Sequence, residues 1–578
     1  MNIINIEHLK YKYPGTEKLA LDDISLSIKK GEFIGIIGAN GAGKSTLTQA
    51  IIGLVPRFYN GAYGGKVTVN DTVVEECPVE EMCEQVGLIF QNPFNQLSGA
   101  KETVYDELAF GLQNLGIPRE EMKSRIDKAL KDLDIWEYRE RNPYDLSGGQ
   151  MQRVAIASIL VMQPDVVILD EPTSQLDPQG TEEVFRVVED LRKTGITIIM
   201  VEQKMEKIAA YCDRVILMHE SKVVDFDTPE KIFSRNDLDK MGIQPPAFTR
   251  ICRQYRLENA DGTYPATLLA TLKLFQGNKD KIKDFRSLKA SPSGTVHSQK
   301  EEKSSDPYRE AVTSENSSSE GLSETSMFKV EDLSFFYKKG VSIFEKLNLN
   351  LDQRRTAIIG QNGAGKTTLV RLLKGLLKPL DGKIYFGKED ISGKTVAMLA
   401  DKVGYVFQNP DGQIFKYKVL DEVMYGPLNV GMTKEKAQEE ALKALKLMGL
   451  SGREAENPYD LELYERKMVA IASVVAMDTD VLILDEPTIA QDYSGREIIG
   501  HMIEELAKKG KLVIAILHDM DFVDANFERV IVMAHGKILA DGIAEEVFSK
   551  EDVLKEARLQ KPYYRELQGL LEATINEM

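Results

Sequence analysis

Gly38-Ala39-Asn40-Gly41-Ala42-Gly43-Lys44-Ser45 fits the pattern G-x-x-x-x-G-K-[ST], and the pattern recurs 322 positions later as Gly360-Gln361-Asn362-Gly363-Ala364-Gly365-Lys366-Thr367. This pattern is typical of a phosphate-binding loop, in which backbone amides and a helix N-terminus face the phosphates. Each loop follows a short apolar run, 33–37 or 356–359. A buried strand that leads into such a loop predicts an α/β fold with a largely parallel sheet. A glycine-rich turn could match by accident, but two copies in the same context argue against that.

The chain is an internal repeat. Several further segments of the first half recur in the same order in the second, at offsets between 315 and 322. They are Phe90-Gln91-Asn92-Pro93 and Phe407-Gln408-Asn409-Pro410, Asn142-Pro143-Tyr144-Asp145-Leu146 and Asn457-Pro458-Tyr459-Asp460-Leu461, and Ile168-Leu169-Asp170-Glu171-Pro172-Thr173 and Ile483-Leu484-Asp485-Glu486-Pro487-Thr488. Chance does not produce this agreement, so the chain is a tandem duplication with two phosphate-binding domains.

The repeat and the composition together predict five segments. We expect phosphate-binding domains at 1–240 and 328–545, and helical C-terminal extensions at 241–275 and 546–578. The segment 276–327 is rich in Ser, Glu, Lys and Thr and has few large apolar residues, which predicts a flexible linker. About 50 flexible residues reach roughly 40 Å, enough to let two halves of one chain meet head to tail.

Composition limits the classes of function. The 578 residues are 43% hydrophobic and 28% charged, which is ordinary for a globular protein, and the net charge is −17. That charge argues against a sequence-independent grip on nucleic acid. Four cysteines without a zinc spacing predict a reduced, cytosolic protein. We expect neither a signal peptide nor a transmembrane helix, so that a membrane role would come through a partner.

The pattern predicts roles in phosphate and Mg²⁺ binding for four residues of the loops. Lys44 and Lys366 are expected to reach the β- and γ-phosphates of a nucleotide, and Ser45 and Thr367 to ligate Mg²⁺ through their hydroxyls.

Two pairs of acidic residues end the later apolar runs. Asp170 and Asp485 stand where a carboxylate can hold Mg²⁺, through water. Glu171 and Glu486 follow directly, and a carboxylate there can orient and deprotonate an attacking water. The alternative is that these acids only cap the next turn.

The stretch Leu146-Ser147-Gly148-Gly149-Gln150 is the signature of ATP-binding cassette (ABC) proteins, and both halves resemble ABC nucleotide-binding domains over nearly their whole length. The resemblance implies two tandem P-loop ABC ATPase domains, each with a mixed, largely parallel sheet, a helical subdomain and a small C-terminal helical extension. It also implies a head-to-tail dimer, in which the signature contacts ATP held by the other half. The implied nucleotide-binding residues are Tyr13, Gly38, Asn40, Gly41, Gly43, Lys44, Ser45, Thr46, Gln91, Ser147, Gly148, Gly149, Gln150, Tyr337, Gly360, Asn362, Gly363, Gly365, Lys366, Thr367 and Thr368.

Further roles follow from the same resemblance. Gln91 and Gln408 match the family's Q-loop, which senses the γ-phosphate and Mg²⁺ and contacts the transmembrane partner. The implied Mg²⁺ residues are Ser45, Gln91, Asp170, Thr367, Gln408 and Asp485. Tyr13 and Tyr337 match the aromatic residue that stacks on adenine, although a lone tyrosine is more often strand packing.

The second half lacks the signature. Alignment on the repeat places Leu461-Glu462-Leu463-Tyr464-Glu465 where the first half has Leu146–Gln150. Glycine lets a backbone approach a phosphate closely, whereas Leu463 and Tyr464 put side chains there. Glu462 and Glu465 add negative charge, and two like charges at 4 Å repel by about 4 kcal/mol at an effective dielectric near 20. The basic residues available to offset part of this charge are Arg466 and Lys467.

The first half has a different defect. The alignment pairs Gln203 with His518, and the family's histidine at this position contacts the γ-phosphate and helps to position the water. Glutamine donates a hydrogen bond but carries no charge. Read alone, His518 would be a buried structural histidine.

Both defects fall on one composite site. Site one combines Lys44 and Gln203 with the Glu462–Glu465 stretch, and site two combines Lys366 and His518 with the intact signature. We therefore expect site two to hydrolyse ATP and site one mainly to bind it. The catalytic residues are Glu486, His518 and Gln408, with Glu171 as the counterpart in the first half.

The segments 91–97 and 408–415 resemble the Q-loop region of energy-coupling factor (ECF) ATPases, which drive vitamin and transition-metal uptake in prokaryotes. The resemblance implies two partners, a membrane scaffold subunit and a substrate-binding membrane subunit, and a peripheral position on the cytoplasmic face of the cell membrane. One tandem chain would serve each transporter. Candidate residues for scaffold contact are Asp106, Glu107, Asp421 and Glu422, although a solvated acidic face is an equal alternative.

Two other classes remain open. A soluble twin-cassette ABC protein that acts on ribosomes or DNA would usually have a charged helical linker and two intact signatures. A regulatory ATP-binding scaffold would not need the complete second site. The transported substrate is not encoded in the motifs.

Overall fold

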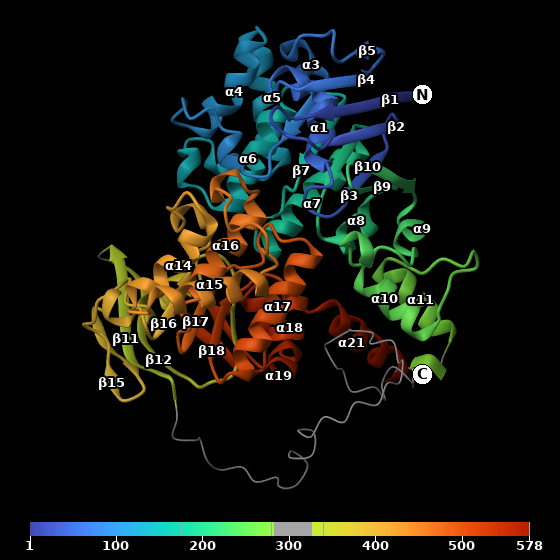
Figure 1. The fold of residues 1–578 in the computed structure, drawn as a ribbon. Coiled ribbons are helices and arrows are strands. Elements are labelled where there is room, and N and C mark those ends of the chain that lie inside the picture. Colours follow the sequence, from blue (N-terminus) through green and yellow to red (C-terminus); the bar gives the residue numbers. More distant parts are fainter. Residues whose placement is uncertain (175, 279, 283–325, 339, 577–578) are drawn as a thin grey trace.

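The computed structural model describes residues 1–174, 176–278, 280–282, 326–338 and 340–576 as two similar α/β halves (Figure 1). The predicted linker at 276–327 falls mostly on 283–325, outside the described residues. Its first residues differ from the expectation, because Gln276 lies within helix α11 and Ile282 is buried in an apolar cluster with Phe275. Packed structure therefore continues beyond residue 275.

The first half contains two sheets. A four-stranded antiparallel sheet has the order β2-β1-β4-β5, with strands Asn2–Lys12 (β1), Leu21–Lys29 (β2), Ala62–Val69 (β4) and Thr72–Val73 (β5). A six-stranded sheet has the order β10-β9-β3-β8-β7-β6, with strands Phe33–Ile37 (β3), Val86–Ile89 (β6), Val166–Asp170 (β7), Thr197–Val201 (β8), Arg214–His219 (β9) and Lys222–Asp227 (β10). All neighbours in the second sheet are parallel except β9 and β10.

The helices of the first half flank the six-stranded sheet, build a helical subdomain and form the C-terminal extension (Figure 1). They are Lys44–Ile52 (α1), Leu54–Arg57 (α2), Val79–Gln85 (α3), Val104–Asn114 (α4), Arg119–Asp132 (α5), Gly148–Leu160 (α6), Pro178–Lys193 (α7), Met205–Tyr211 (α8), Pro229–Phe233 (α9), Ala247–Tyr255 (α10) and Leu268–Gly277 (α11).

The second half repeats this plan. Its antiparallel sheet has the order β12-β11-β14-β15, with strands Phe328–Lys338 (β11), Val341–Leu351 (β12), Asp381–Phe386 (β14) and Glu389–Asp390 (β15). Its larger sheet has the order β16-β17-β18-β13-β19-β20, with strands Thr356–Ile359 (β13), Val403–Val406 (β16), Val481–Asp485 (β17), Leu512–Ile516 (β18), Arg529–Ala534 (β19) and Lys537–Ile543 (β20). Its helices are Lys366–Leu373 (α13), Val419–Asn429 (α14), Lys434–Leu447 (α15), Leu463–Val475 (α16), Tyr493–Lys508 (α17), Met520–Asn526 (α18), Ala544–Ser549 (α19), Glu551–Glu556 (α20) and Tyr563–Asn576 (α21).

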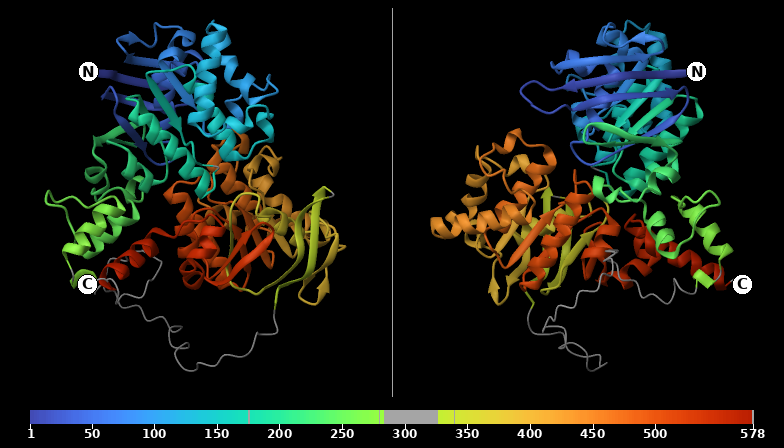
Figure 2. Two further views of the ribbon diagram at one scale, coloured as in Figure 1. Left: turned by 180° about the vertical axis from the view of Figure 1, so that it is seen from behind. Right: turned by 45° about the vertical axis from the view of Figure 1, so that its right-hand side comes forward.

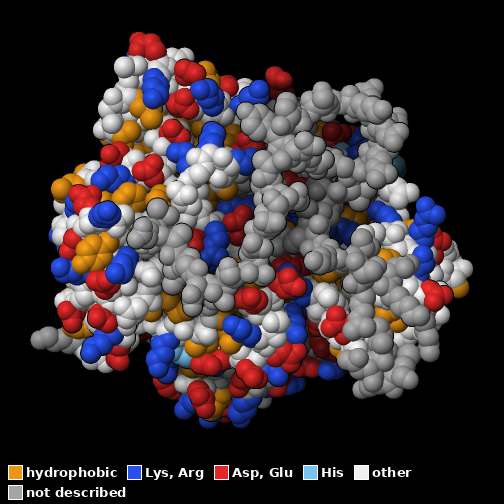
Figure 3. Space-filling view, turned by 90° about the horizontal axis from the view of Figure 1, so that it is seen from below, with side chains coloured by type: hydrophobic (Ala, Val, Ile, Leu, Met, Phe, Trp, Pro, Cys, Tyr) orange, Lys and Arg blue, Asp and Glu red, His pale blue; other side chains and the backbone are white. Residues whose placement is uncertain are grey.

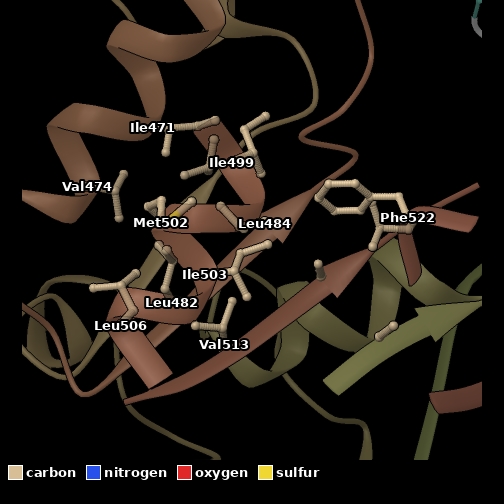
Figure 4. Close-up of a cluster of buried hydrophobic side chains, with 14 of the residues drawn as sticks. Ile471, Val474, Leu482, Leu484, Ile499, Met502, Ile503, Leu506, Val513 and Phe522 are labelled. Atoms are coloured by element: carbon tan, nitrogen blue, oxygen red, sulfur yellow. The ribbon is translucent and has the colours of Figure 1, made fainter. Parts of the chain in front are cut away.

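Apolar side chains cover both faces of each larger sheet, as the continuous apolar runs predict. Figure 4 shows one of these cores, in which Ile471 and Val474 of α16 and Ile499 and Met502 of α17 pack over Leu484 of β17. These cores fix the carboxyl ends of the strands, where the site residues lie.

The C-terminal extensions join the two halves. Helices α10 and α11 pack against α21, far away in the sequence (Figures 1 and 2). Leu567 and Leu571 of α21 are buried with Phe248 and Ile251 of α10, and the Phe248 and Tyr563 rings meet edge to face at 5.5 Å between centroids. On the described part of the face seen in Figure 3, acidic and basic side chains are interspersed.

Candidate functional site

The two phosphate-binding loops have nearly the same geometry. Gly43 and Gly365 precede α1 and α13 with φ of 97° and 98°, in the left-handed region that favours glycine. A Cβ on Gly43 would lie 2.5 Å from the Ala20 carbonyl oxygen, so that no larger residue fits. Both loops therefore present their backbone and a helix N-terminus at the carboxyl end of a buried strand, which is a place for phosphate.

The lysines of the loops are buried and bonded to the loops themselves. Lys44 Nζ donates to the carbonyls of Gly38 and Ala39, each at 2.9 Å. Lys366 Nζ donates to the equivalent carbonyls of the second loop at 2.7 and 2.9 Å. Burial lowers the pKa of both lysines, that of Lys366 to about 8, while the nearby acids oppose the shift. An incoming phosphate would meet a poorly solvated ammonium group, which favours a strong charge interaction.

Each strand-end aspartate faces the hydroxyl that follows the loop lysine. The Thr367 hydroxyl donates to Asp485 Oδ1 at 3.4 Å. Burial raises the pKa of Asp170, and the hydrogen bond from Ser45 and the charge of Lys44 partly oppose this. A hydroxyl paired with a carboxylate is an oxygen donor set that suits Mg²⁺, which would neutralise phosphate charge when bound. The residues present therefore fit the ion.

The glutamate that follows is held in a strained conformation in both halves. Glu171 has φ of 47° and Glu486 has φ of 51°, which is uncommon for a residue with a side chain. Gln91 Nε2 donates to Glu171 at 2.7 Å, and Gln408 Nε2 donates to Glu486 at 2.8 Å. The fold thus brings the Q-loop glutamine to the glutamate in each half.

Besides the Q-loop glutamine, the strand-end glutamate has a second side-chain partner, and this partner differs between the halves. In the first half Gln203 Nε2 donates to Glu171 Oε1 at 2.8 Å. In the second half His518 Nε2 lies 3.0 Å from Glu486 Oε1. Gln203 and His518 therefore occupy equivalent positions in space as well as in the alignment.

This difference changes the charge of the glutamate. Burial raises the pKa of Glu171 to about 7, and Lys44 and Gln203 only partly oppose the shift. Burial acts in the same direction on Glu486, but the hydrogen bond and charge of His518, together with Lys366 and Lys467, outweigh it and lower the pKa. Glu486 therefore favours the ionised form more strongly than Glu171 does.

Two further residues connect the halves, and the motif search missed them. Asp492 Oδ2 accepts a hydrogen bond from the Asn40 amide at 2.9 Å, and Asp177 Oδ2 accepts one from the Asn362 amide at 3.0 Å. Each aspartate also caps its own helix, at Gly180 and Gly495. The available signal was that both aspartates follow the strand-end glutamate at the same spacing in the repeat. The halves thus face each other head to tail, with each phosphate-binding loop touching the other half.

The segment that replaces the signature in the second half also faces the phosphate-binding loop of the first half. Glu462 Oε1 lies 3.9 Å from the position that a Cβ on Gly41 would take. Burial raises the pKa of Glu462, Glu465 adds to the rise, and Lys44 opposes it. A carboxylate therefore stands next to the first phosphate-binding loop. Arg466 and Lys467 do not supply the expected compensation, because Arg466 pairs with Asp411 at 3.1 Å and Lys467 is buried beneath the Q-loop of its own half. Arg453 instead pairs with Glu465 at 2.9 Å.

The comparisons with known proteins agree with this geometry. The family model described as ABC transporter matches residues 21–174 and 344–489. A relative from Methanosarcina acetivorans, provisionally named an ABC transporter ATP-binding protein, is 38% identical over 97% of this chain and 89% of its own length. The chain belongs to the ABC transporter family.

Two further matches lie within the same family. A Caldanaerobacter subterraneus protein with the same provisional description is 34% identical over 99% of this chain and 97% of its own length. The solved structure of CbiO1 from Clostridium perfringens, titled as part of the ABC transporter complex CbiONQ, is 35% identical over 41% of this chain and 93% of its own, with a TM-score of 0.37. As an ABC transporter ATPase with two tandem cassettes, the chain uses ATP with Mg²⁺ in a reaction coupled to transport. Within the described residues, no helix has both the length and the apolar character needed to cross a bilayer.

The intact ABC signature begins helix α6. Ser147 caps this helix, accepting from the Gln150 amide at 3.4 Å, while Gln150 Oε1 accepts from the Ser147 amide at 3.1 Å. A Cβ on Gly149 would lie 3.5 Å from Gly180, in the helix that Asp177 caps. The structure thus places Gly149 beside the segment that reaches the second loop, although the Ser147 hydroxyl bonds to its own helix.

The two tyrosines expected at adenine lie beside the phosphate-binding helices of the cassettes. The Tyr13 hydroxyl is 3.2 Å from Thr46 Oγ1, and the Tyr337 hydroxyl is 3.3 Å from Thr368 Oγ1. Tyr337 is 55% exposed, so part of its ring is open to a ligand. Stacking on adenine remains a prediction.

The candidates for contact with an ABC membrane partner separate into two kinds. Glu107 and Glu422 are buried and accept hydrogen bonds from the Ser98 and Lys416 amides at 2.6 and 2.8 Å, so they anchor their own loops. The expectation that they lie on the surface is wrong. Asp106 and Asp421 are exposed. Exposed aromatic side chains in the same region are Phe94, Tyr144, Phe415, Tyr417, Tyr425 and Tyr459.

Proposed function

We propose that this chain is the ATP-hydrolysing subunit of a prokaryotic ECF-type importer for a vitamin or a transition metal. Both of its cassettes would come from one polypeptide, and the membrane scaffold and the substrate-binding subunit would be separate proteins. In this proposal the chain sits on the cytoplasmic face of the membrane, and site two hydrolyses ATP while site one holds it.

The observation that carries the division of labour is the pairing of Glu486 with His518 at 3.0 Å. A general base must be ionised and held in a fixed orientation, and the contact with His518 supports both conditions for Glu486. Glu171 has a neutral partner and a pKa near 7, and Glu462 stands at the same site one. The same composite site thus has the weaker base and the lost signature.

The transport role is supported by the surface around the Q-loops. Phe94 and Tyr144 stack at 6.0 Å, and Phe415 and Tyr425 meet edge to face at 4.7 Å, although all four are at least 40% exposed. These exposed aromatic side chains, together with the exposed Asp106 and Asp421, offer apolar area and acidic groups for a basic, apolar partner helix. The ECF class itself rests on the resemblance of the Q-loop segments.

Co-purification tests the transport role. The tagged chain, produced in its native cells and extracted with mild detergent, should bring down hydrophobic membrane subunits. Charge reversal of Asp106 and Asp421 should weaken this association and leave the ATPase activity of the purified chain within about twofold, because both side chains lie on the surface. Recovery of ribosomes or nucleic acid instead of membrane subunits would favour the soluble twin-cassette class.

A further inference from the structure

Lysine 467 is a buried cation on the helix that begins with the altered signature. Its side chain is almost fully enclosed, with 2% of the residue exposed. Its Nζ atom donates to three backbone carbonyls, those of Phe407 at 3.0 Å, Gln408 at 2.6 Å and Asp485 at 3.4 Å. An ammonium group has three donors, so this set satisfies it and offsets the cost of its burial.

The three carbonyls belong to the two segments that build the catalytic end of site two. Phe407 and Gln408 form the start of the Q-loop, and Asp485 ends β17 directly before Glu486. The Gln408 side chain in turn donates to Glu486 Oε2 at 2.8 Å. Lys467 therefore spans the gap between the backbone that positions Gln408 and the backbone that positions Glu486.

The first half lacks this connection. The equivalent residue is Gln152, five positions after Ser147 as Lys467 is five positions after Glu462, and it is 1% exposed. Gln152 Nε2 is buried without a hydrogen-bond partner in the described structure. One neighbouring Q-loop contact is shared, since the Phe90 amide donates to Gln96 and the Phe407 amide donates to Gln413. Gln413 Nε2 also donates to the Ala470 carbonyl at 2.8 Å. The lysine bridge is thus a specific difference between the halves.

We propose that Lys467 is a positioning residue for ATP hydrolysis at site two. It holds the Q-loop at a fixed distance from the end of β17, so that the side chains of Gln408 and Glu486 stay paired when a ligand or partner binds the Q-loop. Helix α16, which begins at the altered signature facing site one, would thus support hydrolysis at site two through Lys467. This proposal rests on the assignment of hydrolysis to site two.

The test is the full-length Lys467→Gln variant, which copies the residue that the first half accepts at the same buried position. We expect kcat for ATP to fall roughly 10- to 100-fold with KM within twofold, because misplacement of catalytic groups affects the transition state more than binding. The matched control is Gln152→Lys, which should leave kcat within twofold. An unchanged kcat in Lys467→Gln overturns the proposal.

Two further variants separate positioning from folding and from the site assignment. Lys467→Arg keeps the charged donors but is larger, so it should retain more kcat than Lys467→Gln if the hydrogen bonds matter. If the arginine variant is the worse of the two, the residue acts through its volume and the proposal fails. Glu486→Gln is measured alongside: if it keeps turnover, the assignment to site two is wrong, whereas its inactivity together with a fully active Lys467→Gln rejects only the role of Lys467.

Discussion

His518 Nε2 lies 3.0 Å from Glu486 Oε1, and this pair distinguishes the second cassette from the first. Burial alone would raise the pKa of Glu486, but the hydrogen bond and charge of His518, with the charges of Lys366 and Lys467, reverse the shift. The equivalent Glu171 has a glutamine partner and a pKa near 7. The two copies of one fold therefore shift the pKa values of their strand-end glutamates in opposite directions.

Replacing His518 by the residue of the first half should disable site two. In His518→Gln we expect kcat to fall roughly 100-fold or more, because an ionised, oriented base contributes about 10²- to 10⁴-fold. The measurement is steady-state ATPase activity at pH 7.5. Gln203→His is the reciprocal control and should leave kcat within about threefold. Equal activity of His518→Gln and the unaltered chain would contradict this role.

Asp177 should couple the first half to site two. It accepts from the Asn362 amide of the second loop and from the Gly180 amide of its own helix. Asp177→Ser retains a good helix cap but is too short to bridge, so it separates the two roles. We expect a roughly 5- to 15-fold loss in kcat/KM, since a hydrogen bond to a charged group contributes about 1.5 kcal/mol. Thermal unfolding should change little, and an unchanged kcat/KM would show that the bridge is dispensable.

The junction of the C-terminal extensions should depend on Leu567. This residue of α21 is fully buried among α10 and α11 side chains. Leu567→Ala should destabilise the junction by about 2–5 kcal/mol through lost burial and a cavity. Limited proteolysis should then release the C-terminal segment faster. Leu269→Ala, at a position that is 71% exposed, is the control and should behave like the unaltered chain.

Asp521 should make the same region sensitive to pH. Burial, Asp519 and Glu206 raise its pKa well above the ordinary value, and its Oδ1 accepts from the Tyr563 amide at 3.0 Å. Because the pKa of Asp521 is raised in the folded state, the contribution of this residue to folding stability is fully present below about pH 4. That contribution is lost as the pH rises through the folded-state pKa. Asp521→Asn keeps the acceptor without the charge, so it should raise the Tm at pH 8 and differ less at pH 5.

The control for this pH effect is Asp524→Asn, which breaks the ion pair with Arg565 at 2.8 Å. That variant should lower the Tm at pH 8. If Asp521→Asn also lowers the Tm at pH 8, the inference that the charge of Asp521 destabilises the folded chain is wrong.

The sequence was sufficient for the parts of the site that lie within one cassette. Gly43 and Gly365, and the glutamates after β7 and β17, are determined by local backbone geometry and by buried apolar strands. The equivalence of Gln203 and His518 follows from the repeat, whereas the contact of Gln203 with Glu171 depends on β7 and β8 being neighbours in the sheet.

Contacts that depend on orientation could not be predicted in the same way. Asp177 and Asp492 matter because of how the two halves face each other, which no local pattern specifies. Glu107 and Glu422 lie in first turns of helices, where acids are usually solvated, but their loops fold back onto them. Lys467 likewise points under its own Q-loop rather than toward site one.

The most direct test of the central claim compares Glu486→Gln with Glu171→Gln in steady-state ATPase assays of the full chain. Glutamine preserves the size of the side chain and removes the base. The account predicts that Glu486→Gln abolishes turnover while Glu171→Gln keeps most of it, because His518 favours the ionised form of Glu486, whereas Glu171 has a raised pKa and an uncharged glutamine partner. Loss of turnover in Glu171→Gln with retention in Glu486→Gln would contradict the assignment of hydrolysis to site two.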